Sequence, residues 1–238
     1  MSTQKLFSNR PMAWTAVVGL AVFLAAIPAI AQSGNGDYIL LIASGFLCDS
    51  GDSSACPAMV KSADDASYEI SGVGSFDTKN KLITATGTFT HKSPNGNPLE
   101  TGIWMANELV SFESYGVAPD ALMREGRTLG PPQSGSKRLP MFSGSMPTGG
   151  LAVLRIRLIP VLGFAKNATL QVNCALGKVP DEHPSEGIRL VFEGGALEFD
   201  EEVNGRTLFL LTRPGAGAAA KAPAPKADTN PAPNDVQR

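Results

Sequence analysis

The fold is decided by residues 81–115, whose sequence is KLITATGTFTHKSPNGNPLETGIWMANELVSFESY. Two long segments, residues 81–92 and 102–115, are rich in β-branched and aromatic residues and are joined by a Pro/Asn/Gly turn at residues 93–98. In the first segment a column of four threonines alternates with apolar and small residues, which is typical of a strand with one solvated face. The stretch therefore predicts a long β-hairpin, with further strands laid against it.

The second half of this hairpin breaks its own alternation. Trp104, Ala106, Val110 and Phe112 share one parity, and Glu108 interrupts them. Such an interruption indicates a β-bulge, which adds one residue to a strand and re-aims a side chain. We expect a bulge near residues 106–108, with Glu108 pointing to solvent.

Other segments show the same alternation, separated by Gly- and Pro-rich turns. With the hairpin they predict about nine short strands and little helix, in an antiparallel β-sandwich or, alternatively, a β-barrel. The expected additional strands are 37–47, 67–76, 151–162, 169–176, 187–193, 196–203 and 206–212. Short helical turns are expected at residues 58–62 and 119–126.

The N-terminal residues 1–31 have the three parts of a secretory signal peptide. Lys5 and Arg10 give a positive start, residues 15–30 form an apolar run, and an Ala-Ile-Ala site ends at residue 31. The apolar run is shorter than the roughly 20 residues that span a bilayer. We therefore expect cleavage, no transmembrane segment in the mature chain, and a periplasmic or extracellular location.

The exported part divides into a short linker (32–36), a single β-domain (37–213) and a tail (214–238). The tail is mostly Ala, Pro, Gly, Lys, Asp and Asn, a composition that predicts disorder. Two of the 20 basic residues lie in the signal segment, which leaves 18 against 22 acidic ones, a net charge of −4. This balance offers no basic patch, so nucleic acid is not an expected partner.

Three cysteines remain for an exported chain, in which a disulfide is permitted. Cys48 and Cys56 bracket a short polar loop and form the simplest pair, while a Cys48–Cys174 bond is the alternative. Sequence alone does not choose between these pairings. Cys174 alternates with apolar residues on one strand face, so we expect it to be buried.

Glu108 is the candidate catalytic residue, because an apolar strand face beside Trp104 could raise the pKa of its carboxyl group. Glycoside hydrolysis needs a second carboxylate across a cleft, and the sequence offers no convincing one. Trp104 and Tyr115 are candidates for a platform that stacks on a sugar, although Trp104 favours a core position. Arg155 and Arg157 are candidates for binding an acidic partner, although a solvated strand face is the favoured interpretation.

Metal ligands are sparse. Asp49 and Asp52 flank the cysteine loop and are weak candidates for calcium, but their spacing does not match the twelve-residue calcium loop. His91 and His183 lack a second ligand at metal-binding spacing, so both are expected to be surface histidines. No cofactor is expected.

In its general layout the chain resembles a group of uncharacterised secreted bacterial β-proteins. Four packing patterns carry this resemblance: residues 87–91, 102–104, 153–157 and 170–174. It covers most of residues 67–211 and implies export and a β-fold, but it brings no known activity.

The sequence therefore predicts an exported, non-enzymatic β-domain that acts as a binding or structural module at the cell envelope or outside it. Its expected partner is a glycan or an envelope protein. The alternative hypothesis is an extracytoplasmic carbohydrate-active hydrolase that uses Glu108 as its acid.

Overall fold

The computed structural model describes residues 35–50, 52–118, 144–182, 185–194 and 197–214. The expected signal peptide, the tail beyond Pro214, the expected helical turn at 119–126 and His183 lie outside the described residues.

The structure confirms the all-β class. All eleven strands are antiparallel to their partners, and the one helical element of the described residues is a 3-10 helix, η1. The elements are β1 (Gly36–Ile42), η1 (Gly45–Ser50), β2 (Ala58–Lys61), β3 (Ser67–Asp77), β4 (Leu82–Lys92), β5 (Pro98–Val117), β6 (Met146–Pro160), β7 (Lys166–Cys174), β8 (Gly187–Phe192), β9 (Glu198–Phe199), β10 (Glu201–Asn204) and β11 (Thr207–Pro214).

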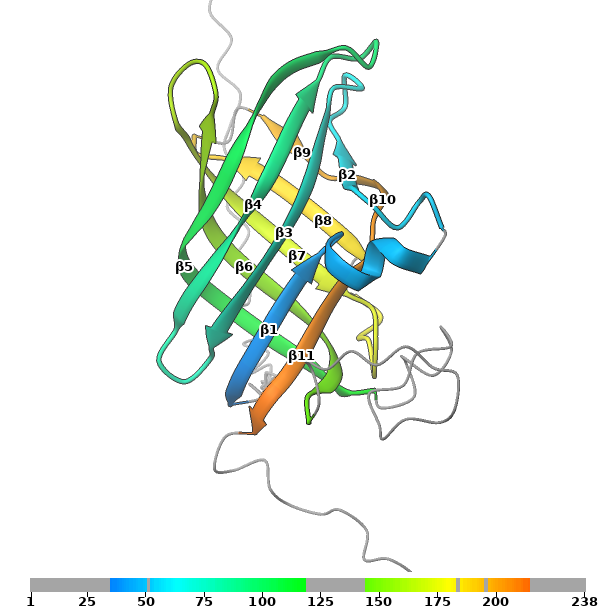
Figure 1. Ribbon diagram of the computed structural model, residues 1–238, viewed down its shortest axis with the longest axis vertical. Coiled ribbons are helices and arrows are strands. Elements are labelled where there is room, and N and C mark those ends of the chain that lie inside the picture. Colours follow the sequence, from blue (N-terminus) through cyan, green and yellow to red (C-terminus); the bar gives the residue numbers. More distant parts are fainter. Residues whose placement is uncertain (1–34, 51, 119–143, 183–184, 195–196, 215–238) are drawn as a thin grey trace, which may run out of the picture. The chain divides into compact units, whose positions relative to one another are not determined.

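All eleven strands belong to one hydrogen-bonded sheet, so the expected division into two sheets of a sandwich is not confirmed. The strands β3, β1, β11, β6, β5 and β4 pair in a closed circuit, since β4 bonds to both β3 and β5. From β3 the sheet extends through β2 to β10, and from β6 it extends through β7 and β8 to β9. Figure 1 shows the sheet wrapping round, so that β3 and β4 cross over β7 and β8.

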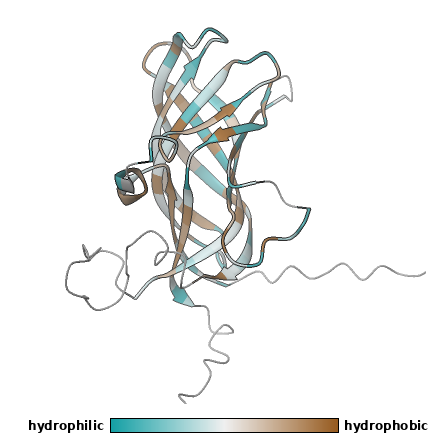
Figure 2. Ribbon diagram, turned by 90° about the vertical axis from the view of Figure 1, so that its right-hand side faces the viewer, coloured by the Kyte–Doolittle hydropathy of each residue, from teal (hydrophilic) through white to brown (hydrophobic). Residues whose placement is uncertain are grey.

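Hydrophobic and hydrophilic residues alternate along the strands (Figure 2), and buried apolar side chains form the core. On β4, Ala85 and Phe89 are buried, whereas Thr84, Thr86 and Thr88 are exposed, as the threonine column predicts. The core holds aromatic clusters near both ends of β3. One contains Tyr38, Phe76, Phe112 and Phe209, and the other contains Tyr68, Phe89, Phe192 and Phe199.

The expected hairpin is β4–β5, and its irregular half has more than one bulge. The register of β5 against β6 shifts between Ala106 and Glu108, as predicted, and again at 109/111 and 114/116. Each shift changes which parity faces inward. The buried side chains of β5 are therefore Trp104, Leu109, Phe112 and Tyr115, spaced three apart beyond the first bulge.

The Trp104 side chain lies across the neighbouring strand β4 and reaches β3. Its indole Nε1 donates a hydrogen bond to the Ser71 carbonyl oxygen at 3.0 Å, and its side chain is fully buried. A Cβ atom at Gly72 would lie 2.2 Å from Trp104 Cζ2, and one at Gly87 would lie 2.6 Å from Nε1. The glycines therefore make room for the indole ring.

Two local predictions were wrong. Residues 58–62, expected as a helical turn, contain β2, because Ala58 and Val60 are buried while β2 pairs with β3 and β10. The first strand ends at Ile42 rather than at residue 47. Ala43 and Gly45 have φ values of 40° and 59°, and this left-handed backbone turns the chain into η1.

Candidate functional site

The predicted catalytic residue lies on the outer face of the sheet. The Glu108 side chain is 55% exposed, and its Oε2 atom lies 3.2 Å from Arg155 Nε. The first bulge of β5 gives it this position, as expected. The Glu108 carboxylate is therefore solvated and ion-paired on the surface of the sheet, and not set on an apolar face as the hydrolase hypothesis requires.

The two aromatic residues proposed as a stacking platform are both buried. Trp104 belongs to the core, and the Tyr115 hydroxyl donates a hydrogen bond to Asn173 Oδ1 at 2.8 Å. The second and third bulges of β5 bring Tyr115 inward, against the expectation of a surface position. Neither ring is available to a bound sugar in this structure.

The two candidate arginines lie on β6, on the solvated face that the sequence favours. Arg155 pairs with Glu108, and Arg157 is exposed two residues further along the strand. An exposed pair of this kind contributes at most about 1 kcal/mol to stability. These residues therefore form part of the ordinary solvated surface of β5 and β6.

The cysteines pair within the local loop. Cys48 and Cys56 form a disulfide with their Cα atoms 5.5 Å apart. Cys174 is free and fully buried on β7. Burial, more than the nearby Glu186, raises the pKa of its thiol to about 12. A thiol that is buried and protonated at neutral pH is not a nucleophile.

The candidate calcium ligands do not converge. Asp52 accepts a hydrogen bond from the Ser54 amide at 2.9 Å and lies 3.2 Å from Arg206. The hydrogen bonds from Ser54, with a smaller effect from Arg206, hold the pKa of Asp52 below its usual value. Asp49 is exposed, and the described residues contain no cluster of three or more His, Cys, Asp or Glu side chains.

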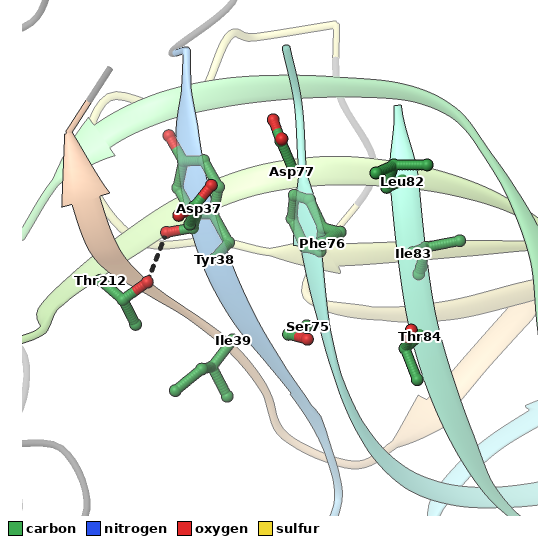
Figure 3. A pocket seen from close by; sticks show the side chains of 10 residues that line it. All are labelled: Asp37, Tyr38, Ile39, Ser75, Phe76, Asp77, Leu82, Ile83, Thr84 and Thr212. Atoms are coloured by element: carbon green, nitrogen blue, oxygen red, sulfur yellow. Dashed lines mark hydrogen bonds between the residues drawn. The ribbon is translucent and has the colours of Figure 1, made fainter. Parts of the chain in front are cut away.

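A groove of about 360 Å³ crosses the ends of β1, β3 and β4 (Figure 3). Its two carboxylates, Asp37 and Asp77, stand opposite each other on paired strands. Asp37 lies 3.2 Å from Arg213, and hydrogen bonds from the Asn80 side chain and backbone lower the pKa of Asp77. A general acid at neutral pH needs a raised pKa, which Asp77 lacks, and Asp37 is engaged in an ion pair, so the groove does not suit glycoside hydrolysis.

His91 lies half-buried at the opposite end of the β3–β4 pair, and no sequence pattern indicated this burial. The ring of His91 stacks on Tyr68 with centroids 4.5 Å apart and planes 7° from parallel. Across the strand pair, His91 faces Glu100, whose Oε2 atom lies 2.7 Å from Lys166 Nζ. The expectation of a simple surface histidine was therefore wrong, because Tyr68 and Phe199 cover part of the ring.

Burial and nearby charges shift the pKa values of His91 and Tyr68. Burial is the main cause that lowers the pKa of His91, and Lys166 adds to it, while Glu100 and Asp64 act in the opposite direction. Burial, with a contribution from Glu100, raises the pKa of the Tyr68 hydroxyl. At neutral pH the interior of this end therefore presents a neutral histidine and tyrosine beside the Glu100–Lys166 ion pair.

Next to this ion pair stands a group of exposed apolar side chains, which we call the apolar tip. It comprises Leu99 on β5 (61% exposed) and three residues of the β6–β7 loop: Val161 (77%), Leu162 (85%) and Phe164 (91%). A pocket of about 290 Å³ lies between Leu99 and the first two loop residues, with Glu100 and Thr101 in its lining.

The loop of the apolar tip is joined to the sheet at its base. The Val161 amide donates a hydrogen bond to the Thr101 carbonyl at 2.8 Å, and β7 begins at Lys166, which pairs with Glu100. A sequence signal for the tip does exist: the apolar run of β6 continues past Pro160 through a turn that contains Gly163. Turn residues are usually polar, so an apolar turn is informative.

The chain matches no protein-family profile, no curated protein and no solved structure. The resemblance to secreted bacterial β-proteins thus stays a prediction. Within the described residues, no helix is long and apolar enough to cross a membrane.

Proposed function

We propose that this chain is an exported, non-catalytic β-domain that works by binding through its apolar tip at the cell envelope or outside it. The observation that carries the proposal is the exposure of Val161, Leu162 and Phe164, at 77%, 85% and 91%, within one four-residue segment. Contiguous exposed apolar side chains mark interaction sites, whereas single ones are ordinary.

The attachment of the tip supports a role in binding. Its loop is tied to β5 by the Val161–Thr101 hydrogen bond and lies beside the Glu100–Lys166 ion pair. Side chains presented on a rigid base lose less conformational entropy when they bind. The β-sheet thus serves as the scaffold that holds an apolar loop in water.

The chemistry of the other candidate groups supports a non-catalytic role. Glu108 is solvated and paired with Arg155, Asp52 is paired with Arg206, and the Cys174 thiol is buried. A solvated carboxylate in an exposed ion pair and a thiol buried in the core do not suit a general acid or a nucleophile.

Two observations support export. The N-terminal sequence has the pattern of a signal peptide, and Cys48 and Cys56 form a disulfide. Structural disulfides persist in oxidising compartments and are rare in the cytosol.

The test measures protection of the apolar tip. In the protein lacking residues 1–31, Leu162→Cys places a reactive thiol on the tip, and Leu82→Cys places one on the far part of β4, where Leu82 is 64% exposed. The native Cys174 is buried and does not interfere. We expect envelope membranes of the native cells to slow maleimide labelling of the Leu162→Cys variant and to leave the Leu82→Cys variant unchanged.

Equal labelling of the two variants with and without envelope membranes would contradict binding through the tip. A separate assay with chromogenic glycosides tests the non-catalytic part of the proposal. Turnover that disappears in Glu108→Gln would establish a hydrolase instead.

A further inference from the structure

We propose that the apolar tip inserts into the interface of a lipid bilayer, so that this domain is a peripheral membrane binder with Phe164 as its most exposed anchor. This inference rests on the proposed binding function and names its partner. The bilayer is favoured by the shape, the area and the charge of the tip.

The Phe164 end of the tip projects from the surface. Exposure increases along the loop from Val161 at 77% to Phe164 at 91%, and Phe164 lies outside the pocket that Val161 and Leu162 line with Leu99. A protein partner would need a preformed pocket that closes round such an apex. A fluid bilayer surrounds an inserted side chain without one, because the hydrophobic effect is non-directional.

The area of the tip is small for a protein interface. A fully exposed aliphatic or aromatic side chain offers about 100–200 Å² of apolar surface. With exposures of 61%, 77%, 85% and 91%, the four side chains together offer about 300–600 Å². A stable dimer or complex buries about 800 Å² on each partner. A second copy of this chain is therefore a poor occupant, whereas a few inserted side chains suffice for reversible lipid binding.

The charges at the base of the tip balance. Lys166 pairs with Glu100 at 2.7 Å, and Lys92 pairs with Glu69 at 2.5 Å. The two lysines are thus neutralised, and their aliphatic stems can lie at the headgroup level. Insertion should depend on apolar contact and not on anionic lipids or low salt.

The orientation of the domain agrees with this arrangement. Figure 1 shows the β4–β5 turn and the β6–β7 loop at one end of the strands, and the start of β1 and the end of β11 at the other. Insertion of the tip therefore leaves Gly36 and Pro214 facing away from the bilayer.

The experiment is flotation of the chain lacking residues 1–31 with protein-free phosphatidylcholine vesicles. We compare the unsubstituted protein, the double variant Leu162→Ser/Phe164→Ser, and a matched control, Val73→Ser/Leu82→Ser, whose residues are 50% and 64% exposed on β3 and β4. The tip variant should lose at least about tenfold in partitioning, and the control should lose less than about twofold. Because all four sites are exposed, the fold should persist, and an unreactive Cys174 thiol checks this in each variant.

Raising the salt from about 0.05 to 0.5 M should leave flotation within about twofold, since the charges at the base are already paired. Equal flotation of all variants, or flotation that requires anionic lipid and disappears at high salt, would overturn the inference. Absence of flotation combined with protection of the tip by native envelopes would also overturn it, and would indicate a protein partner while the proposed function stands. Absence of both effects would reject both proposals.

Discussion

The packing of Trp104 on Gly72 makes a prediction that can be worked out from distances. Gly72→Ala adds a Cβ atom 2.2 Å from Trp104 Cζ2 and 2.8 Å from the Thr86 carbonyl oxygen. Neither neighbour moves easily. The indole is fully buried and hydrogen-bonded to Ser71, and the carbonyl belongs to the backbone of β4.

Overpacking a core typically costs about 1–3 kcal/mol, and a 2.2 Å contact places this site at the upper end. Replacing glycine by alanine also lowers the conformational entropy of the unfolded chain, which offsets about 0.4–1 kcal/mol of this loss of stability. We therefore expect Gly72→Ala to lower the free energy of unfolding by about 2 kcal/mol. The exposed neighbour Val73→Ala is the control and should change it by less than about 0.5 kcal/mol.

A double-mutant cycle assigns this loss to the indole ring. Trp104→Leu removes Cζ2 but leaves the 2.8 Å contact with the Thr86 carbonyl oxygen, so adding Gly72→Ala in that background should cost less than in the unsubstituted protein, and the coupling energy should be about 1 kcal/mol. Urea unfolding followed by far-UV circular dichroism measures all four proteins without relying on tryptophan emission. If Gly72→Ala is as stable as the unsubstituted protein, or destabilises both backgrounds equally, the packing argument is refuted.

Further predictions concern the cysteines, the histidine and the surface carboxylate. Cys174, buried and with a pKa of about 12, should not react with a thiol reagent at neutral pH in the folded protein, and one thiol should react in denaturant without reductant. Replacing Cys48 and Cys56 by alanine should lower the free energy of unfolding by about 2–3 kcal/mol for a bridge of sequence separation 8, measured by urea unfolding. Burial lowers the pKa of His91 in the folded state, so the unfolded chain takes up this proton first and stability falls as pH drops through about 6.5. His91→Gln should reduce the loss of stability between about pH 7.5 and 5.5, and an unchanged loss would contradict the burial of the ring. Glu108→Gln should change stability by less than about 1 kcal/mol, because its ion pair is exposed, and a larger effect in urea unfolding would contradict this.

Local alternation predicted much of this fold. The threonine column of β4 correctly indicated its solvent face, and the interruption at Glu108 correctly indicated a bulge. The bulges at 109/111 and 114/116 were not predicted, because each changes the parity that the next residues appear to follow. Period-two counting has no independent signal for such shifts.

The pairing of strands that lie far apart in the chain could not be predicted from the sequence either. β2 was mistaken for a helical turn because its strand conformation depends on β3 and on β10, more than a hundred residues away in the chain. Strand propensity depends strongly on such context. The closed circuit of strands likewise requires β11 to pair with both β1 and β6, which no local pattern specifies.

The setting of His91 and the apolar tip differ in how far the sequence could predict them. The setting of His91 is created by Tyr68 and Phe199, which come from other strands, so the histidine carried no motif. The apolar tip did have a sequence signal, because apolar residues continue past the end of β6 at Pro160. They were interpreted as part of a strand that ends at residue 162. An apolar residue in sequence does not reveal whether a neighbouring element covers it, and here none of Val161, Leu162 and Phe164 is covered.

The most direct measurement of membrane insertion uses Phe164→Trp as a depth probe. The expected mature chain has one other tryptophan, Trp104, which is fully buried and serves as a constant background. With phosphatidylcholine vesicles whose acyl chains carry bromine, the emission from position 164 should shift to the blue and be quenched, while the unsubstituted protein changes little. Unshifted, unquenched emission at saturating lipid would show that the apolar tip stays in water.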